Sequence, residues 1–273
     1  MSKLDYENVK EQIVSFIKEQ VEESGCKGVV IGLSGGLDSA VVTKLCILAC
    51  GKDKVYTLTM PTSQNKHSID AEDLAIIFKT KNSVIEISPI LDIFSRASSE
   101  NVYLNIQMRK NRLVAGNTAA RVRMILLYQL ANSHNLLVAG TGNKSELMTG
   151  YFTKHGDGGC DMLPIGDLYK TEVKKLAKIL GVPKSIIDKA PTAGLWENQT
   201  DEEELGITYK KLDIFLRVFN YYKGNTWLSM SHNLKNNDEI KILKLSDETI
   251  DKLLIRIRNS RHKLIMPRTC YIY

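Results

Sequence analysis

The sequence predicts an α/β fold, a doubly wound and mostly parallel sheet flanked by helices. Short apolar runs rich in β-branched residues, typical of buried parallel strands, occur at 28–33, 55–60, 84–87 and 136–139. Segments with helical apolar spacing lie between and after them. Strands that alternate with helices form βαβ units, and their ligands gather beyond the carboxyl ends of the strands.

Length and composition are those of a globular domain. The chain has 273 residues, 43% apolar and 25% charged, and we expect residues 1–273 to form a single domain. A net charge of +6 suits anionic nucleotide substrates and is too small to argue for nucleic acid. Five cysteines without framework spacing suggest a reducing cytosol, and no apolar run is long enough to span a membrane. We therefore expect a cytoplasmic protein without a membrane or nucleic-acid partner.

The first half of the chain alternates in order. An amphipathic helix over 5–22 ends at Gly25, and the first strand follows. The second strand, 55–60, stops at Pro61, and a helix is predicted over 68–78. A third strand over 84–87 ends at Ser88-Pro89, before a helix around 90–96. These elements supply the first βαβ units.

The loop after the first strand has the composition of a phosphate site. It reads Gly32-Leu33-Ser34-Gly35-Gly36-Leu37-Asp38-Ser39, and its glycines let backbone N–H groups close on an oxyanion at a helix start. The spacing is neither that of a Walker loop nor that of a dinucleotide fold. Asp38 lies where a Walker loop has its lysine, and an acid beside phosphates needs a divalent cation, so we interpret it as a Mg²⁺ ligand. The alternative is a glycine turn that opens an ordinary helix.

A second acid follows the fourth strand. Residues 136–139 lead into a glycine-bearing turn at 140–143, on the ligand side of the sheet. Glu146 comes next on a short helix, and we predict that it faces the same Mg²⁺ as Asp38. A solvent-facing glutamate is the equally weighted alternative.

The helix predicted over 118–132 is apolar on more than one side. Such a helix must pack against its own sheet on one side and against something else on the other. It either lies deep in the core or forms a homodimer interface, and the residues alone do not decide between these alternatives. Arg121 and Arg123 on so apolar a helix suggest a paired or anion-binding role.

Two loops are candidates for covering the site. The glycine-rich segment 149–164 contains Lys154, Asp157 and Asp161, which favour a substrate loop over a flexible linker. A helix over 168–180 follows, with Lys170 near its start, where it could reach a phosphate. The acidic loop 190–206 suggests a lid or a crossover to a partner subunit. Helices are predicted over 209–220 and from Ser246 to about 259, whereas 223–238 is poorly determined.

The motifs resemble those of a known family. The pattern S-G-G-x-D-S resembles the pyrophosphate loop of the N-type ATP pyrophosphatases, and the wider set resembles NAD⁺ synthetase. That set comprises S-G-G-L-D-S (34–39), G-N-x-x-A-R-x-R-M (116–124), G-T-G-N-K-S-E (140–146), T-G-Y-F-T-K-H-G-D-G-G-x-D (149–161), L-P-I-G-D-L-Y-K (163–170), P-T-A-G-L-W (191–196), Q-T-D-E-E-E-L-G (199–206) and H-K (262–263).

The resemblance implies a Rossmann-like adenine nucleotide alpha hydrolase fold and a homodimeric ligase. The implied reaction amidates deamido-NAD⁺ with ammonia, through an NAD-adenylate, and releases AMP and pyrophosphate from the co-substrate ATP. Larger members carry a glutaminase domain for which this chain lacks the length, so free ammonia is expected. The main alternative is another N-type ATP pyrophosphatase, such as a tRNA-modifying adenylating enzyme. A non-catalytic nucleotide sensor is a second alternative.

The resemblance also assigns roles to single residues. Residues Gly32 to Ser39 with Thr141, Lys170 and Thr192 would bind ATP, and Asp38 and Glu146 would bind Mg²⁺. Asp157 would position ammonia or accept its proton. The expected catalytic residues are therefore Asp38, Asp157 and Lys170. The residues implied to contact deamido-NAD⁺ are Arg121, Lys154, Asp161, His262 and Lys263.

Overall fold

The computed structural model describes residues 4–63, 68–99, 111–192, 199–222, 224, 226–270 and 272. Its elements in chain order are α1 (Tyr6–Ser24), β1 (Val29–Gly32), α2 (Leu37–Cys50), η1 (Lys52–Lys54), β2 (Val55–Thr59), α3 (Ser68–Phe78), β3 (Lys81–Val84), α4 (Ser88–Ser99), α5 (Arg112–His134), β4 (Leu137–Val138), α6 (Lys144–Thr149), α7 (Lys170–Ile179), α8 (Lys184–Ile187), α9 (Asp201–Leu205), α10 (Tyr209–Tyr221), α11 (Trp227–Asn236), α12 (Asp238–Ile242), α13 (Asp247–Ser260) and η3 (Arg261–Lys263).

The described strands form one parallel sheet in the order β3-β2-β1-β4, which confirms the predicted fold class. Val29 pairs with Val55 on one side and with Leu137 on the other, so β1 is central. Beyond β4, a parallel bridge between Ala139 and Met162 adds a short piece of the 149–164 loop to the sheet. The order places the carboxyl ends of β1 and β4 side by side, where both acid-bearing motifs follow.

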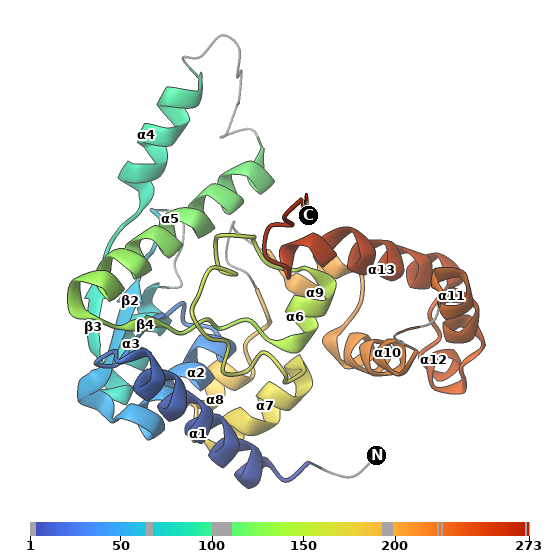
Figure 1. The fold of residues 1–273 in the computed structure, drawn as a ribbon, viewed down its shortest axis with the longest axis horizontal. Helices are drawn as coiled ribbons and strands as arrows, with labels where there is room; N and C mark the ends of the chain where they lie inside the picture. The colour runs from blue at the N-terminus through green and yellow to red at the C-terminus, as the bar shows by residue number, and fades with distance from the viewer. Residues whose placement is uncertain are drawn as a thin grey trace.

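Both faces of the sheet are covered. Val29 and Ile31 of β1 are fully buried in a cluster with α1, α2 and α7, whereas the intervening Val30 packs under α5. Successive strand residues point to opposite faces, so the near-continuous apolar run of β1 reflects burial on both sides. Figure 1 shows α5 on one face and α1 and α2 on the other.

The helices after α8 form a separate apolar cluster. Phe215, Leu212 and Leu216 of α10 are fully buried there, together with residues of α11, α12 and α13. These four helices gather at the right of Figure 1, and α6 and α9 lie between them and the sheet. The acid-bearing motifs therefore lie where a parallel-sheet layer meets a helical cluster.

Several predicted boundaries were wrong. β3 occupies Lys81–Val84 rather than 84–87, because the buried Ile87 follows the strand instead of belonging to it. α5 begins at Arg112 rather than near 118, since Asn111 caps it through the N–H of Val114.

Helices α9 and α11 were not predicted, whereas two predicted helix ends were confirmed. Part of the expected 190–206 loop is helical, as α9, and its centre at 193–198 lies outside the described residues. The undetermined 223–238 segment contains α11. The cap at Ser246 and the end of α1 at Gly25 are confirmed.

Candidate active site

The loop from Gly32 to Ser39 leaves backbone donors available at the start of α2. Leu33 donates its N–H to Leu58 O (3.0 Å) and so extends the sheet by one residue. Gly35 then adopts φ +76°, a left-handed conformation that favours glycine. Gly36 is the N-cap residue and has no side chain to accept a hydrogen bond, so the first N–H groups of α2 have no side-chain cap. An anion bound here gains these N–H groups and the helix dipole.

Two serines brace the loop from inside. The hydroxyl oxygens of Ser34 and Ser39 lie 3.1 Å apart, and Ser39 Oγ donates to Gly36 O (3.0 Å). The N–H of Gly36 in turn donates to Ser34 Oγ (3.3 Å). These local bonds hold the loop in one shape before any ligand arrives.

A charged triad lies directly behind the loop. Asp38 belongs to the first turn of α2, Glu146 to α6, and Lys170 is the first residue of α7. Lys170 Nζ donates to Asp38 Oδ2 and to Glu146 Oε1 (3.4 Å), and Asn143 Nδ2 donates to Asp38 Oδ1 (3.5 Å). Only 9% of the lysine side chain and 16% of each carboxylate are exposed. Three helix starts thus bring these groups together.

The electrostatics of the triad keep Lys170 charged. Burial alone would lower its pKa, but the carboxylates of Asp38 and Glu146 outweigh burial and raise it above the ordinary value. Burial raises the pKa of Glu146, with Lys170 opposing and Asp38 reinforcing the shift. The ring of Tyr209 lies 5.2 Å from Lys170 Nζ and adds a cation–π contact. The triad therefore holds two acids around one buried cation.

The triad matches Mg²⁺ in donor type. Asp38 and Glu146 offer hard carboxylate oxygens, and the Lys170 ammonium occupies the kind of position that a cation would take between them. No group of three or more His, Cys, Asp or Glu residues able to hold a metal occurs in the described parts of the chain. A metal here would therefore complete its shell with substrate phosphates and water, as Mg²⁺ commonly does.

The 149–164 segment is tied to the sheet through its carboxylates. Asp161 accepts the N–H of Val138 (2.7 Å) and the hydroxyl of Tyr128 (2.9 Å). Asp157 accepts the N–H of Thr153 (2.9 Å) within a tight turn. The loop is therefore folded on itself and against β4, unlike a flexible linker.

Two lysines join the same loop to η3, the short helical turn that follows α13. Lys263 Nζ donates to the carbonyls of Gly150 (2.8 Å) and Phe152 (2.7 Å). In return, Lys154 Nζ donates to His262 O (2.9 Å). We call these three hydrogen bonds the lysine clasp.

Two further contacts place the clasp. Arg121 of α5 reaches Lys154 O (3.4 Å), so four residues expected at deamido-NAD⁺, Arg121, Lys154, His262 and Lys263, lie together. Gly150 has φ +65°, and a Cβ there would lie 2.0 Å from Ser260 Cβ. The loop and α13 are in contact at a glycine that no other residue can replace without a shift.

The other two residues expected at ATP are Thr141 and Thr192. Thr141 lies half-buried in the turn after β4. Thr192 precedes the segment outside the described residues, so the expected lid is seen only at its two ends.

Sequence reasoning missed the support that α9 and α10 give. Asp201 is 3% exposed; its Oδ2 accepts the Tyr209 hydroxyl (3.0 Å), and its Oδ1 has no partner within the described chain. Asp213 of α10 accepts hydrogen bonds from Ser145, which precedes Glu146, and from Thr171, which follows Lys170. The acidic run at 201–204 is a signal of a helix start that could have indicated α9. The residues around Asp213 contain no comparable signal.

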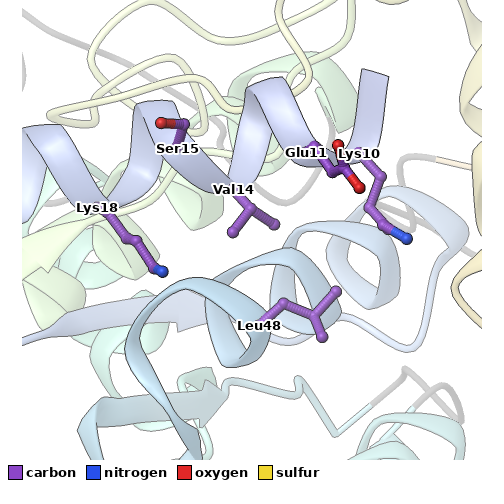
Figure 2. Close-up of a pocket in the computed structure, with 6 residues that line it drawn as sticks. All are labelled: Lys10, Glu11, Val14, Ser15, Lys18 and Leu48. Atoms are coloured by element: carbon purple, nitrogen blue, oxygen red, sulfur yellow. The ribbon is translucent and has the colours of Figure 1, made fainter. Parts of the chain in front are cut away.

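A surface pocket lies elsewhere. Figure 2 shows Val14 of α1 facing Leu48 of α2, with charged side chains around them. Its lining consists of Lys10, Glu11, Val14, Ser15, Lys18 and Leu48. None of these residues was predicted to act in the site, and the pocket lies on the outer side of α1 and α2, away from the triad.

The chain is similar over nearly its whole length to proteins of known function. An NH₃-dependent NAD⁺ synthetase from Methanocaldococcus jannaschii is 47% identical over 96% of both chains, and one from Pyrococcus furiosus is 42% identical over 98% of this chain and 95% of its own.

Two solved structures are also similar to this chain over nearly its whole length. An NMN synthetase from Francisella tularensis (32% identical) matches with a TM-score of 0.81 over 98% of this chain and 99% of its own. An NH₃-dependent NAD synthetase from Campylobacter jejuni (35% identical) matches with 0.74 over 98% and 100%. The NAD synthase family model matches residues 9–267, and this chain belongs to the NAD synthase family.

Proposed function

We propose that this protein is a ligase that amidates deamido-NAD⁺ to NAD⁺ with ammonia and consumes ATP. The observation that carries the proposal is the convergence of Asp38, Glu146 and Lys170 behind an uncapped helix start. Binding a nucleotide requires only the loop, whereas paired acids and a buried lysine behind it suit a change of charge on phosphate. A nucleotide sensor is therefore disfavoured, and the curated relatives give no support to tRNA modification.

The residues divide the first half-reaction among them. The loop from Gly32 to Ser39 holds the ATP phosphates through backbone N–H groups at the start of α2, and Lys170 offsets negative charge that develops as the deamido-NAD⁺ carboxylate attacks the α-phosphorus. Asp38 and Glu146 would hold Mg²⁺, which when bound would polarise the phosphates and offset the charge of the leaving pyrophosphate. Thr141 and Thr192 are proposed to complete the ATP site.

The second half-reaction needs ammonia and a dry site. Ammonia attacks the acyl carbon of the adenylate, the bond to AMP breaks, and a proton leaves the nitrogen. Asp157 is proposed to position ammonia or to take that proton. The folded 149–164 loop is placed to keep water from the adenylate. Arg121, Lys154, Asp161, His262 and Lys263 are proposed to bind deamido-NAD⁺.

The test is a product assay with competing substrates. Purified protein is given Mg-ATP and ammonium with deamido-NAD⁺, with nicotinic acid mononucleotide, or with tRNA, and AMP release is followed. We expect AMP and NAD⁺ in equal amounts with deamido-NAD⁺. The mononucleotide is included because one similar structure is an NMN synthetase. Faster turnover of the mononucleotide would change the substrate, and AMP formed only with tRNA would reject the proposal.

We also propose a homodimer formed through α4 and α5. These helices project together from the sheet layer at the upper left of Figure 1. They expose large apolar side chains, including Ile93 (67%), Leu113 (62%) and Ile125 (54%). Exposed apolar patches of this kind mark interaction sites. Light scattering of an Ile93→Asp variant tests this: the wild type should have twice the monomer mass and the variant should dissociate, whereas a monomeric wild type would refute it.

Neither the described helices nor the cysteines contradict a cytoplasmic enzyme, and we propose that location. Among described residues, no helix combines the length and apolarity needed to cross a bilayer. All five cysteines carry free thiols, as expected in a reducing compartment. Fractionation of cells that express the chain checks this, and recovery outside the cytoplasmic fraction would contradict it.

A further inference from the structure

Asp213 is a buried acid whose two oxygens serve two different elements. It lies on α10 and is 2% exposed. Its Oδ1 accepts the hydroxyl of Ser145 on α6 (2.5 Å), and its Oδ2 accepts the N–H of Thr171 on α7 (2.8 Å). One carboxylate of the helical cluster therefore fixes two helix starts that belong to the catalytic side.

Both partners lie next to a residue of the triad. Ser145 directly precedes Glu146, and Thr171 directly follows Lys170. The fully buried Ser145 closes the arrangement, because its Oγ also accepts the N–H of Lys170 (3.0 Å). The backbones that carry Glu146 and Lys170 are thus joined by a continuous chain of hydrogen bonds through Asp213.

The arrangement also solves a capping problem in α7. This helix has no side-chain cap from its own N-cap residue, so its first N–H groups need acceptors from elsewhere. Ser145 takes the N–H of Lys170 and Asp213 takes that of Thr171. The negative charge of Asp213 at this helix start is favoured by the helix dipole as well.

We propose that Asp213 is a positioning residue of the catalytic site, which sets the distance between Lys170 and Glu146 by holding the start of α7 against α6. This inference rests on the proposed function. A shift of about 1 Å in a catalytic group can cost about 100-fold in rate. Asp213 accepts its hydrogen bonds from the Ser145 hydroxyl and the Thr171 N–H rather than from the side chains of the triad, so its effect is transmitted through the backbone.

The main variant is Asp213→Asn, which keeps the shape. Its carbonyl oxygen can still accept the N–H of Thr171, but its amide is a donor facing the hydroxyl of Ser145. The hydrogen-bond chain must rearrange, and we expect kcat to fall about 10- to 100-fold while KM for deamido-NAD⁺ changes by less than about twofold. Assays are run well below the melting temperature of each variant.

Asp251→Asn is the control. Asp251 of α13 also joins two helices, since it accepts from Ser231 (3.3 Å) and Lys235 (2.8 Å), but its hydrogen bonds do not reach α6 or α7. Its side chain is 48% exposed, so we expect this variant to lose little stability and to keep its kcat. Equal losses of kcat in both variants would overturn the proposal, because the effect would then be a general loss of structure.

Ser145→Ala keeps the proposal falsifiable if Asp213→Asn does not fold. Removing the hydroxyl breaks the same chain, so kcat should fall here too, and unchanged kcat would overturn the positioning role. Where both fold, the double variant should lose no more activity than the worse single variant, since both break one network. Losses that multiply would show independent effects and reject it.

The outcome separates the positioning role from the function. If the wild type makes NAD⁺ and Asp213→Asn keeps its kcat, the positioning role fails and the function stands. If the wild type makes no NAD⁺, the function fails, and binding of Mg²⁺ with a non-hydrolysable ATP analogue decides the positioning role. Weaker binding in Asp213→Asn than in Asp251→Asn would support it, and equal binding would reject it.

Discussion

The two sides of the site use their charged side chains differently. Behind the phosphate loop, Asp38, Glu146 and Lys170 contact one another. In the 149–164 loop and at η3, Lys154 and Lys263 are bonded to backbone carbonyls instead. On our proposal, the phosphate side is assembled before substrate arrives, whereas the other side exchanges bonds to the protein for bonds to deamido-NAD⁺.

The comparison is tested most strongly at Lys170. Lys170→Met leaves Asp38 and Glu146 facing each other without a counter-ion, so we expect a loss of about 3 kcal/mol of unfolding free energy. We also expect kcat to fall about 100- to 1,000-fold, because charge on phosphate is no longer offset. Urea unfolding and AMP release measure the two effects.

Lys144→Met is the control for that change. Lys144 is nearby and pairs with the exposed Asp167 (2.6 Å), so its removal should cost little. A loss of kcat at Lys144 as large as that at Lys170 would show that the triad is not the distinctive part of this side.

A smaller effect is expected where the clasp is opened. Lys263→Met removes two hydrogen bonds from a charged donor and should lower the unfolding free energy by about 1–2 kcal/mol. KM for deamido-NAD⁺ should rise about tenfold, equivalent to about 1.4 kcal/mol, with kcat nearly unchanged. Hydrogen exchange at the N–H of Thr153 should speed up.

The exposed Lys252 provides the comparison, since it forms an ion pair with Glu248 on the same helix (2.7 Å). Lys252→Met should leave both KM and exchange as they are. If Lys263→Met lowers kcat while KM stays constant, the clasp belongs to the chemistry and the two sides do not differ as described.

The smallest effect is a labelling rate that reports whether the loop is closed. Burial raises the pKa of the Cys160 thiol to about 11, and the charge of Asp161 adds to the shift. At pH 8 only about 0.1% is thiolate, so alkylation should be slow and should rise about tenfold per pH unit up to pH 10. Mass spectrometry compares it with the exposed Cys270. Equal rates at pH 8 would mean an open loop.

The sequence predicted the parts of the site that local chemistry specifies. The glycines and Asp38 mark the phosphate loop within eight residues, and a strand and a helix on either side confirm its context. Glu146 followed from the rule that neighbouring strand ends share one edge. The roles assigned to these residues stay predictions, whereas their proximity is observed.

The rest depended on partners far away in the chain. Asp213 looks like an ordinary polar residue of an amphipathic helix, because Thr171 and Ser145 lie 42 and 68 residues earlier. The helix predicted from 118 begins earlier because Gly116 is buried inside α5, where packing overrides its low helix propensity. The third strand was predicted too late in the chain because Ile87 is apolar and buried. Apolar character indicates burial and does not show which residues form the hydrogen bonds of a sheet.

The tight contact between Gly150 and Ser260 has a consequence for synthesis on the ribosome. The glycine loop after β1 is complete early in translation, when only a small part of the chain has emerged. The turn that carries Gly150 cannot make its contact with Ser260 until α13 has left the exit tunnel, because Ser260 is the final residue of that helix. The 149–164 segment therefore gains its full set of contacts long after the loop at β1 has been synthesised.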